Sequence, residues 1–169
     1  MNNNVTDLLN TNHVKLLFSI FEKNSADIRL VGGCIRDKLM HREVKDIDTA
    51  TKIEPKEVLN LLENNNIEYD DFAIQYGSII SYPLNKKIQI TTLREDVNQL
   101  GRHTNVIYTT DWKKDAARRD FTFNALYLGG NNKLYDYYDG QSHLREKKIK
   151  FIGEIEDRIK EDYLRIYRY

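Results

Sequence analysis

The sequence predicts an α+β fold in which a small mixed β-sheet is flanked by helices. Three observations support this class. Short apolar runs that fit strands dominate the middle of the chain, helices are interspersed among them, and helix-like spacing occupies both ends. A chain of 169 residues is long enough to bury a core as one domain, or as one domain with an appendage.

The opening segment predicts a helix or helix pair that ends near Asn24 and covers the sheet. Its apolar side chains recur at helical spacing: Val5, Leu8, Leu9, Leu16, Leu17, Ile20 and Phe21. An apolar strand follows at 28–31, and a glycine pair separates it from a short helix at 34–40. The next strand runs through 46–51.

The middle of the chain alternates one further helix with strands. The helix opens at Pro55, because proline suits a first-turn position, and it ends at the asparagines 64–66. Strands are predicted at 67–69, 77–82 and 87–93. Residues 94–110 lose the period and indicate a loop or ribbon with Gly101 as a pivot.

The last third predicts a charged helix that starts near Asp111 and runs into a strand, and then another strand and turn that end at Gly140. Residues 144–153 are interpreted as a strand edge with a basic, solvated face. The stretch 154–169 has helical spacing and lacks a C-cap signal, so the final helix looks interrupted.

Two carboxylates with one residue between them, Asp46 and Asp48, carry the most chemical information. On an extended strand, residues two apart point to the same face, so both carboxylates would reach one side of the sheet. Carboxylate oxygens are preferred ligands of Mg²⁺. The pair can therefore hold Mg²⁺, and it predicts a catalytic role for both aspartates in combination with the glycine pair that precedes it.

Gly32 and Gly33 open the short helix, where backbone N–H groups bind anions such as phosphate. Arg36, one turn further on, can add its planar guanidinium to the same phosphate chain, while the metal bridges the phosphate oxygens. Together these residues predict a nucleoside triphosphate site. The segment has neither the Gly-Lys-Ser/Thr of a Walker A loop nor the third glycine of a dinucleotide fingerprint.

Composition bounds the partners and the compartment. Lys plus Arg equals Asp plus Glu at 26 each, so no global basic field indicates nucleic acid and any RNA contact must be local. The single cysteine, Cys34, excludes a disulfide framework and a cysteine zinc site. No stretch is apolar enough to cross a bilayer and the start has no signal-peptide character, so we expect a cytoplasmic protein without membrane contact.

Four separated motifs resemble those of class II tRNA nucleotidyltransferases, the CCA-adding enzymes, and of the related bacterial poly(A) polymerases. They are LVGGCIRD with DID (30–48), ITTLRED (90–96), RRDFTFNAL (118–126) and EDYLRIYRY (161–169). The resemblance implies a polymerase-β-like nucleotidyltransferase head at 1–153 and the start of a truncated helical neck at 154–169. It also implies CCA addition to tRNA with Mg²⁺, ATP and CTP, or poly(A) addition to another RNA 3′ end.

The resemblance also assigns roles to individual residues. Asp46 and Asp48 match the metal ligands, and Gly32, Gly33 and Arg36 match the triphosphate-binding turn. Residues that match nucleotide-binding positions follow: Arg119 and Asp120 at the sugar and phosphates, and Asp162, Arg165 and Arg168 at the base edge. The loop after Arg94 matches a segment that helps to switch base specificity.

Gln89 occupies the position where the resembled family has a third metal-facing glutamate, and this change would weaken the electrostatic stabilisation of the ions. The family also continues into helical tRNA-binding domains. We therefore expect an N-terminal fragment with weak nucleotide binding and little turnover on its own. A non-catalytic module, or one subunit of a split enzyme that needs a second chain with the tRNA-binding domains, is the alternative.

Overall fold

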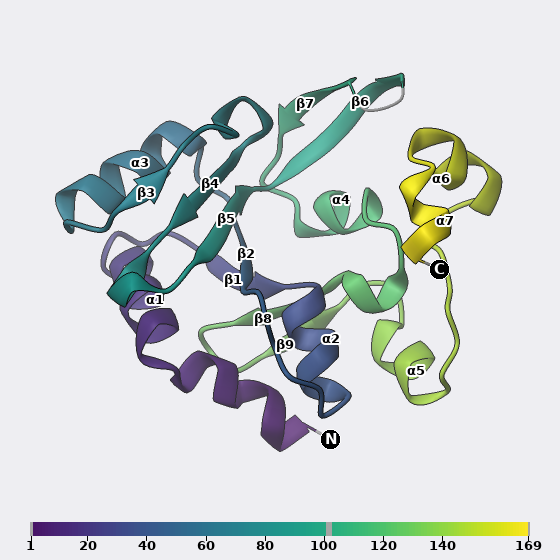
Figure 1. Ribbon diagram of the computed structural model, residues 1–169, viewed down its shortest axis with the longest axis horizontal. Coiled ribbons are helices and arrows are strands. Elements are labelled where there is room, and N and C mark those ends of the chain that lie inside the picture. Colours follow the sequence, from purple (N-terminus) through teal and green to yellow (C-terminus); the bar gives the residue numbers. More distant parts are fainter. Residues whose placement is uncertain (1, 101–102, 169) are drawn as a thin grey trace.

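A seven-stranded sheet runs through the middle of the computed structural model, which describes residues 2–100 and 103–168 (Figure 1). Its strand order is β3-β4-β5-β2-β1-β8-β9. The bounds are β1 Ile28–Val31, β2 Asp48–Thr51, β3 Tyr69–Asp70, β4 Ser78–Ser81, β5 Ile88–Thr92, β8 Leu126–Gly129 and β9 Leu134–Asp136. Strands β2 and β5 pair in parallel and the other described neighbours are antiparallel, so the predicted α+β class with a mixed sheet is confirmed.

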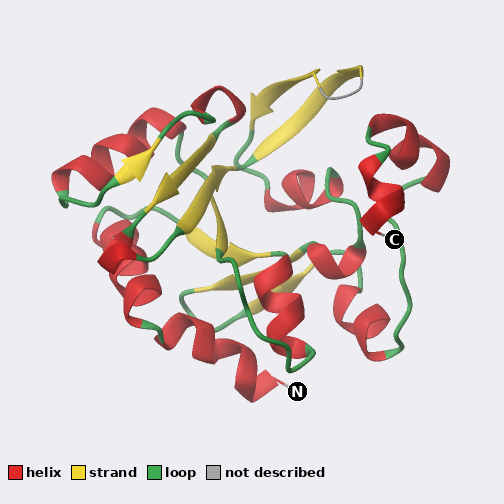
Figure 2. Cartoon of the chain, in the orientation of Figure 1, coloured by secondary structure: helices red, strands yellow, loops and turns green. Residues whose placement is uncertain are grey.

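Four helical segments cover one face of this sheet, as the red ribbons of Figure 2 show. They are η1 Asn2–Asn10, α1 Asn12–Lys23, α2 Gly33–Leu39 and α3 Pro55–Asn64. The predicted helix pair is confirmed, because α1 ends at the C-cap Asn24 and buries its apolar side chains on the strands. A capping box between Glu54 and Glu57 begins α3. Short 3₁₀ turns, η2 Ile74–Tyr76 and η3 Pro83–Asn85, flank β4.

The other face of the sheet packs against α4 Trp112–Ala117 and η4 Thr122–Asn124. Alternation along the strands separates the two faces. In β8, Leu126 and Leu128 face the first core, whereas Tyr127 joins the second core with Trp112. Ala50 also belongs to the second core. On an extended chain Asp48 and Asp46, two and four positions before it, share that face of the sheet.

Residues 94–100 and 103–108 form a two-stranded antiparallel ribbon, β6 Arg94–Leu100 with β7 His103–Tyr108. The ribbon projects from the body of the molecule at the top of Figure 1. Of the two structures predicted for residues 94–110, a loop or a ribbon, the described residues form the ribbon. Gly101, its expected pivot, lies outside the described residues.

Two predictions for the C-terminal third are wrong. The expected edge strand at 144–153 begins inside a helix, α5 Gly140–Arg145, and its strand-like pairing is limited to one bridge between Phe151 and Phe121. Backbone hydrogen bonds from Thr122 to the Lys150 carbonyl and from Ile152 to the Asp120 carbonyl, at 3.0 and 2.9 Å, flank this bridge. The carboxylate of Asp136 accepts the N–H groups of Gly140 and Gln141 at 2.9 Å each, which favours a helix start there. The final helix is divided into α6 Ile155–Glu161 and α7 Leu164–Arg168.

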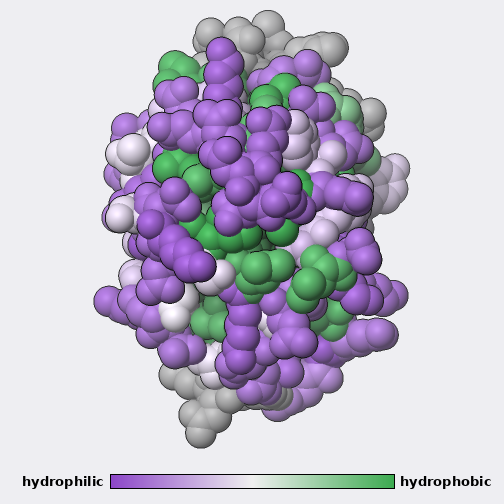
Figure 3. All heavy atoms as spheres, turned by 90° about the vertical axis from the view of Figure 1, so that its left-hand side faces the viewer, coloured by the Kyte–Doolittle hydropathy of each residue, from purple (hydrophilic) through white to green (hydrophobic). Residues whose placement is uncertain are grey.

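Seen from the side that lies at the left of Figure 1, the surface is mostly hydrophilic, with hydrophobic side chains exposed near its middle (Figure 3). Among the residues described, no helix combines the length and the apolar character that a bilayer span requires.

Candidate active site

Asp46 and Asp48 lie where the chain enters β2. Asp48 is the first residue of the strand, and the carbonyl of Ile47 accepts the Gln89 N–H at 3.0 Å, so the pairing with β5 begins one residue earlier. Both aspartates line the same cavity of about 530 Å³, together with Gly33 and Arg36. The structure therefore places the two carboxylates on one wall, beside the glycine turn, as period-two spacing predicts.

Burial raises the pKa of the Asp48 carboxyl, and the charge of nearby Asp46 acts in the same direction. The guanidinium of Arg119 and the ammonium of Lys87 oppose this effect, so both cations lie within electrostatic reach of Asp48. A bound cation would offset the charge of Asp46 that disfavours ionised Asp48. Lys87 carried no role in the sequence-based prediction.

Gln89 lies directly beside Asp48 in the parallel register of β2 and β5. Its side-chain amide donates from Nε2 to the Ser78 hydroxyl at 2.9 Å. It lines a smaller cavity of about 310 Å³ with Asp46, Asp48 and Lys87. The amide thus occupies the wall where a third carboxylate would face the same space.

The residues of this wall fit a divalent cation in their chemistry. Within the part of the chain that the structure describes, no three His, Cys, Asp or Glu side chains are grouped to hold a metal ion. The candidate ligands are therefore Asp46 and Asp48, with the amide oxygen of Gln89 as a neutral third oxygen. An all-oxygen set of this kind suits Mg²⁺, which keeps several waters and is bound by one or two carboxylates.

The glycine turn differs in detail from the predicted phosphate cradle. Gly32 has φ 74° and ψ −125°, a conformation that side chains disfavour. Its N–H donates to the Leu126 carbonyl at 3.1 Å, so Gly32 joins α2 to β8 and does not offer that group to a ligand. Gly33 is the glycine of the pair that lines the cavity. A Cβ at Gly32 would lie 3.3 Å from the Asn124 carbonyl oxygen, which shows how closely η4 approaches this turn.

Arg36 lines the cavity, but each of its three guanidinium nitrogens already donates a hydrogen bond to a protein side chain. Nε and Nη2 donate to the two carboxylate oxygens of Asp37 at 2.9 and 3.0 Å, and Nη1 donates to the Asn124 side chain at 2.9 Å. Asn124 in turn donates to Asp120 at 2.9 Å. Arg36 is therefore linked to the RRD segment by a chain of hydrogen bonds, and phosphate would have to share its guanidinium with Asp37.

Arg119 lies behind the glycine turn. Its Nε donates to the Tyr127 hydroxyl at 3.1 Å and its Nη2 to Asp115 at 3.1 Å. Its Nη1 lies 3.6 Å from where a Cβ on Gly32 would be. The neighbouring Asp120 is buried and its Oδ1 accepts the N–H of Phe121 at 2.8 Å, so in this structure it stabilises the start of η4.

The structure does not bring Asp162 and Arg165, two of the predicted base-reading residues, to the cavity wall. Asp162 adopts an extended conformation between α6 and α7 and accepts the Leu164 N–H at 3.0 Å. Arg165 is buried and donates to the carbonyls of Arg158 and Arg118, at 2.9 and 3.4 Å. The second contact places it at the back of the RRD segment. The side chain of Arg168 lies outside the described residues.

Sequence reasoning missed the residues that hold the site together, namely Asp37, Lys87, Asp115, Asn124 and Tyr127. Asp37 and Asn124 lie inside the quoted motifs, so their position was a usable signal. Tyr127 lies inside an apolar strand pattern, which indicates burial and not a hydrogen-bonding role. Nothing local marks Asp115 or Lys87.

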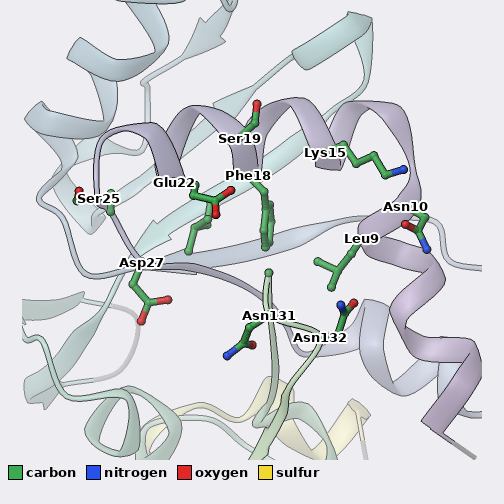
Figure 4. Close-up of a pocket in the computed structure, with 13 residues that line it drawn as sticks. Leu9, Asn10, Lys15, Phe18, Ser19, Glu22, Ser25, Asp27, Asn131 and Asn132 are labelled. Carbon is green, nitrogen blue, oxygen red and sulfur yellow. The ribbon is translucent and has the colours of Figure 1, made fainter.

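A larger cavity of about 630 Å³ lies elsewhere, between α1 and the turn at Gly130, Asn131 and Asn132 (Figure 4). Phe18 and Leu9 point into it, with Lys15 and Glu22 near its rim (Figure 4). Neither Asp46 nor Asp48 lines it. Its greater size does not make it the active site: two carboxylates, Glu22 and Asp27, line it, but among the residues described no arginine that could meet a phosphate does.

Comparison with known proteins identifies the relatives of this arrangement. Residues 28–150 match the family described as the Poly A polymerase head domain. The mitochondrial CCA tRNA nucleotidyltransferase 1 of Danio rerio is 40% identical over 154 residues, which make up 90% of this chain and 36% of that protein. The CCA-adding enzyme of Staphylococcus haemolyticus is 33% identical over 159 residues, or 93% of this chain and 39% of the relative.

Solved structures share the fold. The CCA-adding enzyme of Bacillus stearothermophilus in complex with CTP superposes with a TM-score of 0.82 at 26% identity, over 99% of this chain and 38% of that one. A tRNA nucleotidyltransferase complexed with a primer tRNA and an incoming ATP analogue gives a TM-score of 0.72 at 25% identity, over 90% of this chain and 42% of its own. The chain thus spans well under half the length of the proteins that it matches.

Proposed function

This chain belongs to the family of poly(A) polymerase head domains, and from that premise we propose that it is the nucleotidyltransferase head of an enzyme that adds CCA to tRNA 3′ ends. Over 99% of its length, this chain shares its fold with part of a CCA-adding enzyme. The observation that carries the proposal is the shared cavity of Asp46, Asp48, Gly33 and Arg36. Residues 154–169 are proposed to begin the helical neck of that enzyme.

In the proposed reaction, an RNA 3′-hydroxyl attacks the α-phosphate of a nucleoside triphosphate in line and pyrophosphate leaves. Asp46 and Asp48 would hold the divalent ions, which would supply Lewis-acid activation of the attacking hydroxyl and charge neutralisation at the departing phosphates. Gly33 and Arg119 orient the triphosphate, and Arg36 shares its guanidinium between phosphate and Asp37. Most of the rate enhancement comes from positioning and from preorganised charge.

Base choice is proposed to use Asp162 and Arg165. An arginine donates to base acceptors and a carboxylate accepts from an exocyclic amine, which C and A both carry. For Arg165 to reach a base, its guanidinium must leave the carbonyls of Arg158 and Arg118. We therefore propose that α6 and α7 shift when nucleotide binds. Poly(A) addition is the alternative within the same chemistry, because both reactions use the same catalytic parts.

A second candidate is a non-catalytic module or one subunit of a split enzyme. Gln89 favours it, since the wall beside Asp48 lacks the third negative charge. The terminal helices favour it too, because several of their apolar side chains are exposed: Ile155 at 55%, Tyr163 at 68%, Leu164 at 47%, Ile166 at 52% and Tyr167 at 88%. A second chain with helical tRNA-binding domains would cover them.

The test is to incubate the chain with MgCl₂, labelled CTP or ATP, and tRNA that lacks its CCA end. We expect magnesium-dependent CTP binding and little turnover by the chain alone. Absence of CTP binding at millimolar nucleotide would contradict the proposed function. Efficient CCA addition by these 169 residues alone would contradict the need for further domains.

The variant Gln89→Glu is expected to increase magnesium affinity by roughly tenfold or more, because a third carboxylate then faces the ions. The Ser78 hydroxyl can turn to donate to the new carboxylate, so the fold should tolerate the change. Magnesium titrations of CTP binding and of nucleotide addition measure the effect. Gln75→Glu, at an exposed position in η2, is the matched control. Equal magnesium dependence in both variants would exclude a metal-facing role for position 89.

A further inference from the structure

Asp115, in α4, is a buried carboxylate to which the proposed reaction assigns no role. It is 0% exposed, and four donors surround it. Its Oδ1 accepts from Arg118 Nε at 2.9 Å and from the Arg94 N–H at 3.3 Å. Its Oδ2 accepts from the Tyr127 hydroxyl at 2.7 Å and from Arg119 Nη2 at 3.1 Å. A carboxylate has about four lone-pair sites, so its acceptor capacity is fully used.

This environment keeps Asp115 ionised. Burial alone would raise the pKa of its carboxyl, but Arg119, Arg118 and the Tyr127 hydroxyl together hold that pKa well below its usual range. A buried charge with complete hydrogen bonding fixes the geometry of its partners, because any displacement leaves a buried donor or acceptor unsatisfied.

The four donors come from different parts of the proposed machinery. Arg94 is the first residue of the β6–β7 ribbon, and Lys114 Nζ makes a second link to that ribbon through Glu95 at 3.0 Å. Arg119 faces the glycine turn with its Nη1. Arg118 accepts a hydrogen bond from Arg165 through its carbonyl. A single carboxylate therefore connects the base of the ribbon to the nucleotide-facing arginine.

We propose that Asp115 is a positioning residue that, with Tyr127, orients the Arg119 guanidinium toward the glycine turn and ties that orientation to the start of the ribbon. The inference rests on the proposed function, because it takes the ligand of Arg119 to be a nucleoside triphosphate. A shift of the ribbon base then alters nucleotide affinity through Asp115, without any contact between ribbon and nucleotide.

The variant Asp115→Asn separates this role from simple core stability, because the two sides of the carboxylate differ. The Oδ1 side faces only N–H donors, from Arg94 and Arg118, and these cannot accept from an amide NH₂. On the Oδ2 side, the Tyr127 hydroxyl can turn and accept. The asparagine is therefore expected to place its nitrogen toward Arg119. The Nη2 of Arg119 then loses its carboxylate acceptor, although its Nε keeps the Tyr127 hydroxyl, and Arg94 keeps its partner.

The experiment measures CTP and ATP binding in MgCl₂ by calorimetry, well below the melting temperature of each variant. Asp115→Asn is expected to weaken CTP and ATP binding by the same factor, about 10- to 100-fold, because Arg119 does not read the base. Tyr127→Phe, which leaves the carboxylate in place, should weaken both less. Asp111→Asn, at the N-cap of the same helix where asparagine caps equally well, should change neither.

Amide hydrogen exchange at Arg94 tests the connection to the ribbon. Its protection is expected to persist in Asp115→Asn and to be lost in Asp115→Ala, and CTP should slow this exchange in the wild type but not in Asp115→Asn. CTP binding by Asp115→Asn equal to that of the wild type would overturn the proposal. If the wild type binds no CTP, the proposed function fails. The exchange of the Arg94 amide then still tests the anchor: protection that persists in Asp115→Asn and is lost in Asp115→Ala supports it, and equal protection in both variants contradicts it.

Discussion

Replacing Asp48 by asparagine is expected to abolish the magnesium dependence of CTP binding and to reduce nucleotide addition on the order of a thousandfold. Asp48 and Asp46 line one cavity, and both burial and the charge of Asp46 raise the pKa of the Asp48 carboxyl. A bound cation would offset both effects. Asparagine removes one negative charge from a wall where Gln89 is already neutral. CTP titrations in MgCl₂ and in EDTA measure the effect on binding, and single-turnover extension of tRNA measures the effect on chemistry.

The matched control is Asp71→Asn, the same substitution at an exposed position between β3 and η2. It should leave both measurements unchanged. The Asp48→Asn change should also be made in the Gln89→Glu background, where turnover is expected to be easier to detect. Magnesium-dependent CTP binding that survives Asp48→Asn would show that the ions are held elsewhere, and the catalytic assignment of both aspartates would fail with it.

Local patterns account for most of what the sequence predicted correctly. Helix α1 buries one face, which requires apolar residues at helical spacing, and this spacing stops at Asn24 where the helix stops. The shared wall of Asp46 and Asp48 has the same origin, because two residues apart on an extended chain is a local relation. The glycine pair marked the turn between β1 and α2, where Gly32 has a φ of 74° that most side chains disfavour.

Contacts between distant segments could not be read in this way. The hydrogen bond from Arg36 to Asn124 joins residues 88 positions apart, and although both lie inside the quoted motifs, neither motif shows that the two side chains meet. Tyr127 has the pattern of a core residue, and only the folded chain shows its hydroxyl between Asp115 and Arg119. A buried polar network is specified by three-dimensional geometry, whereas composition and spacing report only on burial.

The break in the terminal helix shows a further limit of prediction from spacing alone. The apolar spacing of residues 154–169 continues as one helix would require, yet Asp162 is extended between α6 and α7. Its carboxylate accepts the N–H of Leu164, and such a side-chain bond competes with the helical hydrogen bond. The Arg165 side chain also donates hydrogen bonds to the carbonyls of Arg158 and Arg118, and the spacing pattern does not indicate either bond.

The substitution Gly140→Ala is expected to lower the free energy of unfolding by about 2–4 kcal/mol, the upper range for overpacking, because the new methyl group has no space. A Cβ at Gly140 would lie 2.3 Å from the Thr122 carbonyl oxygen and 2.7 Å from the Thr122 carbonyl carbon. Backbone atoms cannot rotate away as a flexible side chain can. Thermal unfolding should show a melting temperature lower by roughly 5–15 °C for a chain of this size.

The same clash should weaken CTP binding, because η4 is the segment that α5 would displace. The side chain of Asn124 in η4 accepts a hydrogen bond from Arg36 at 2.9 Å, and the Asn124 carbonyl lies against the Gly32 turn. Gly130→Ala is the matched control, since its Cβ would meet only the Phe18 ring at 3.3 Å, and that side chain can shift. Equal melting temperatures for the two alanine variants would mean that α5 and η4 are not in such close contact in solution. A melting temperature lowered only in Gly140→Ala, with unchanged CTP affinity, would instead show that the nucleotide site tolerates movement of η4.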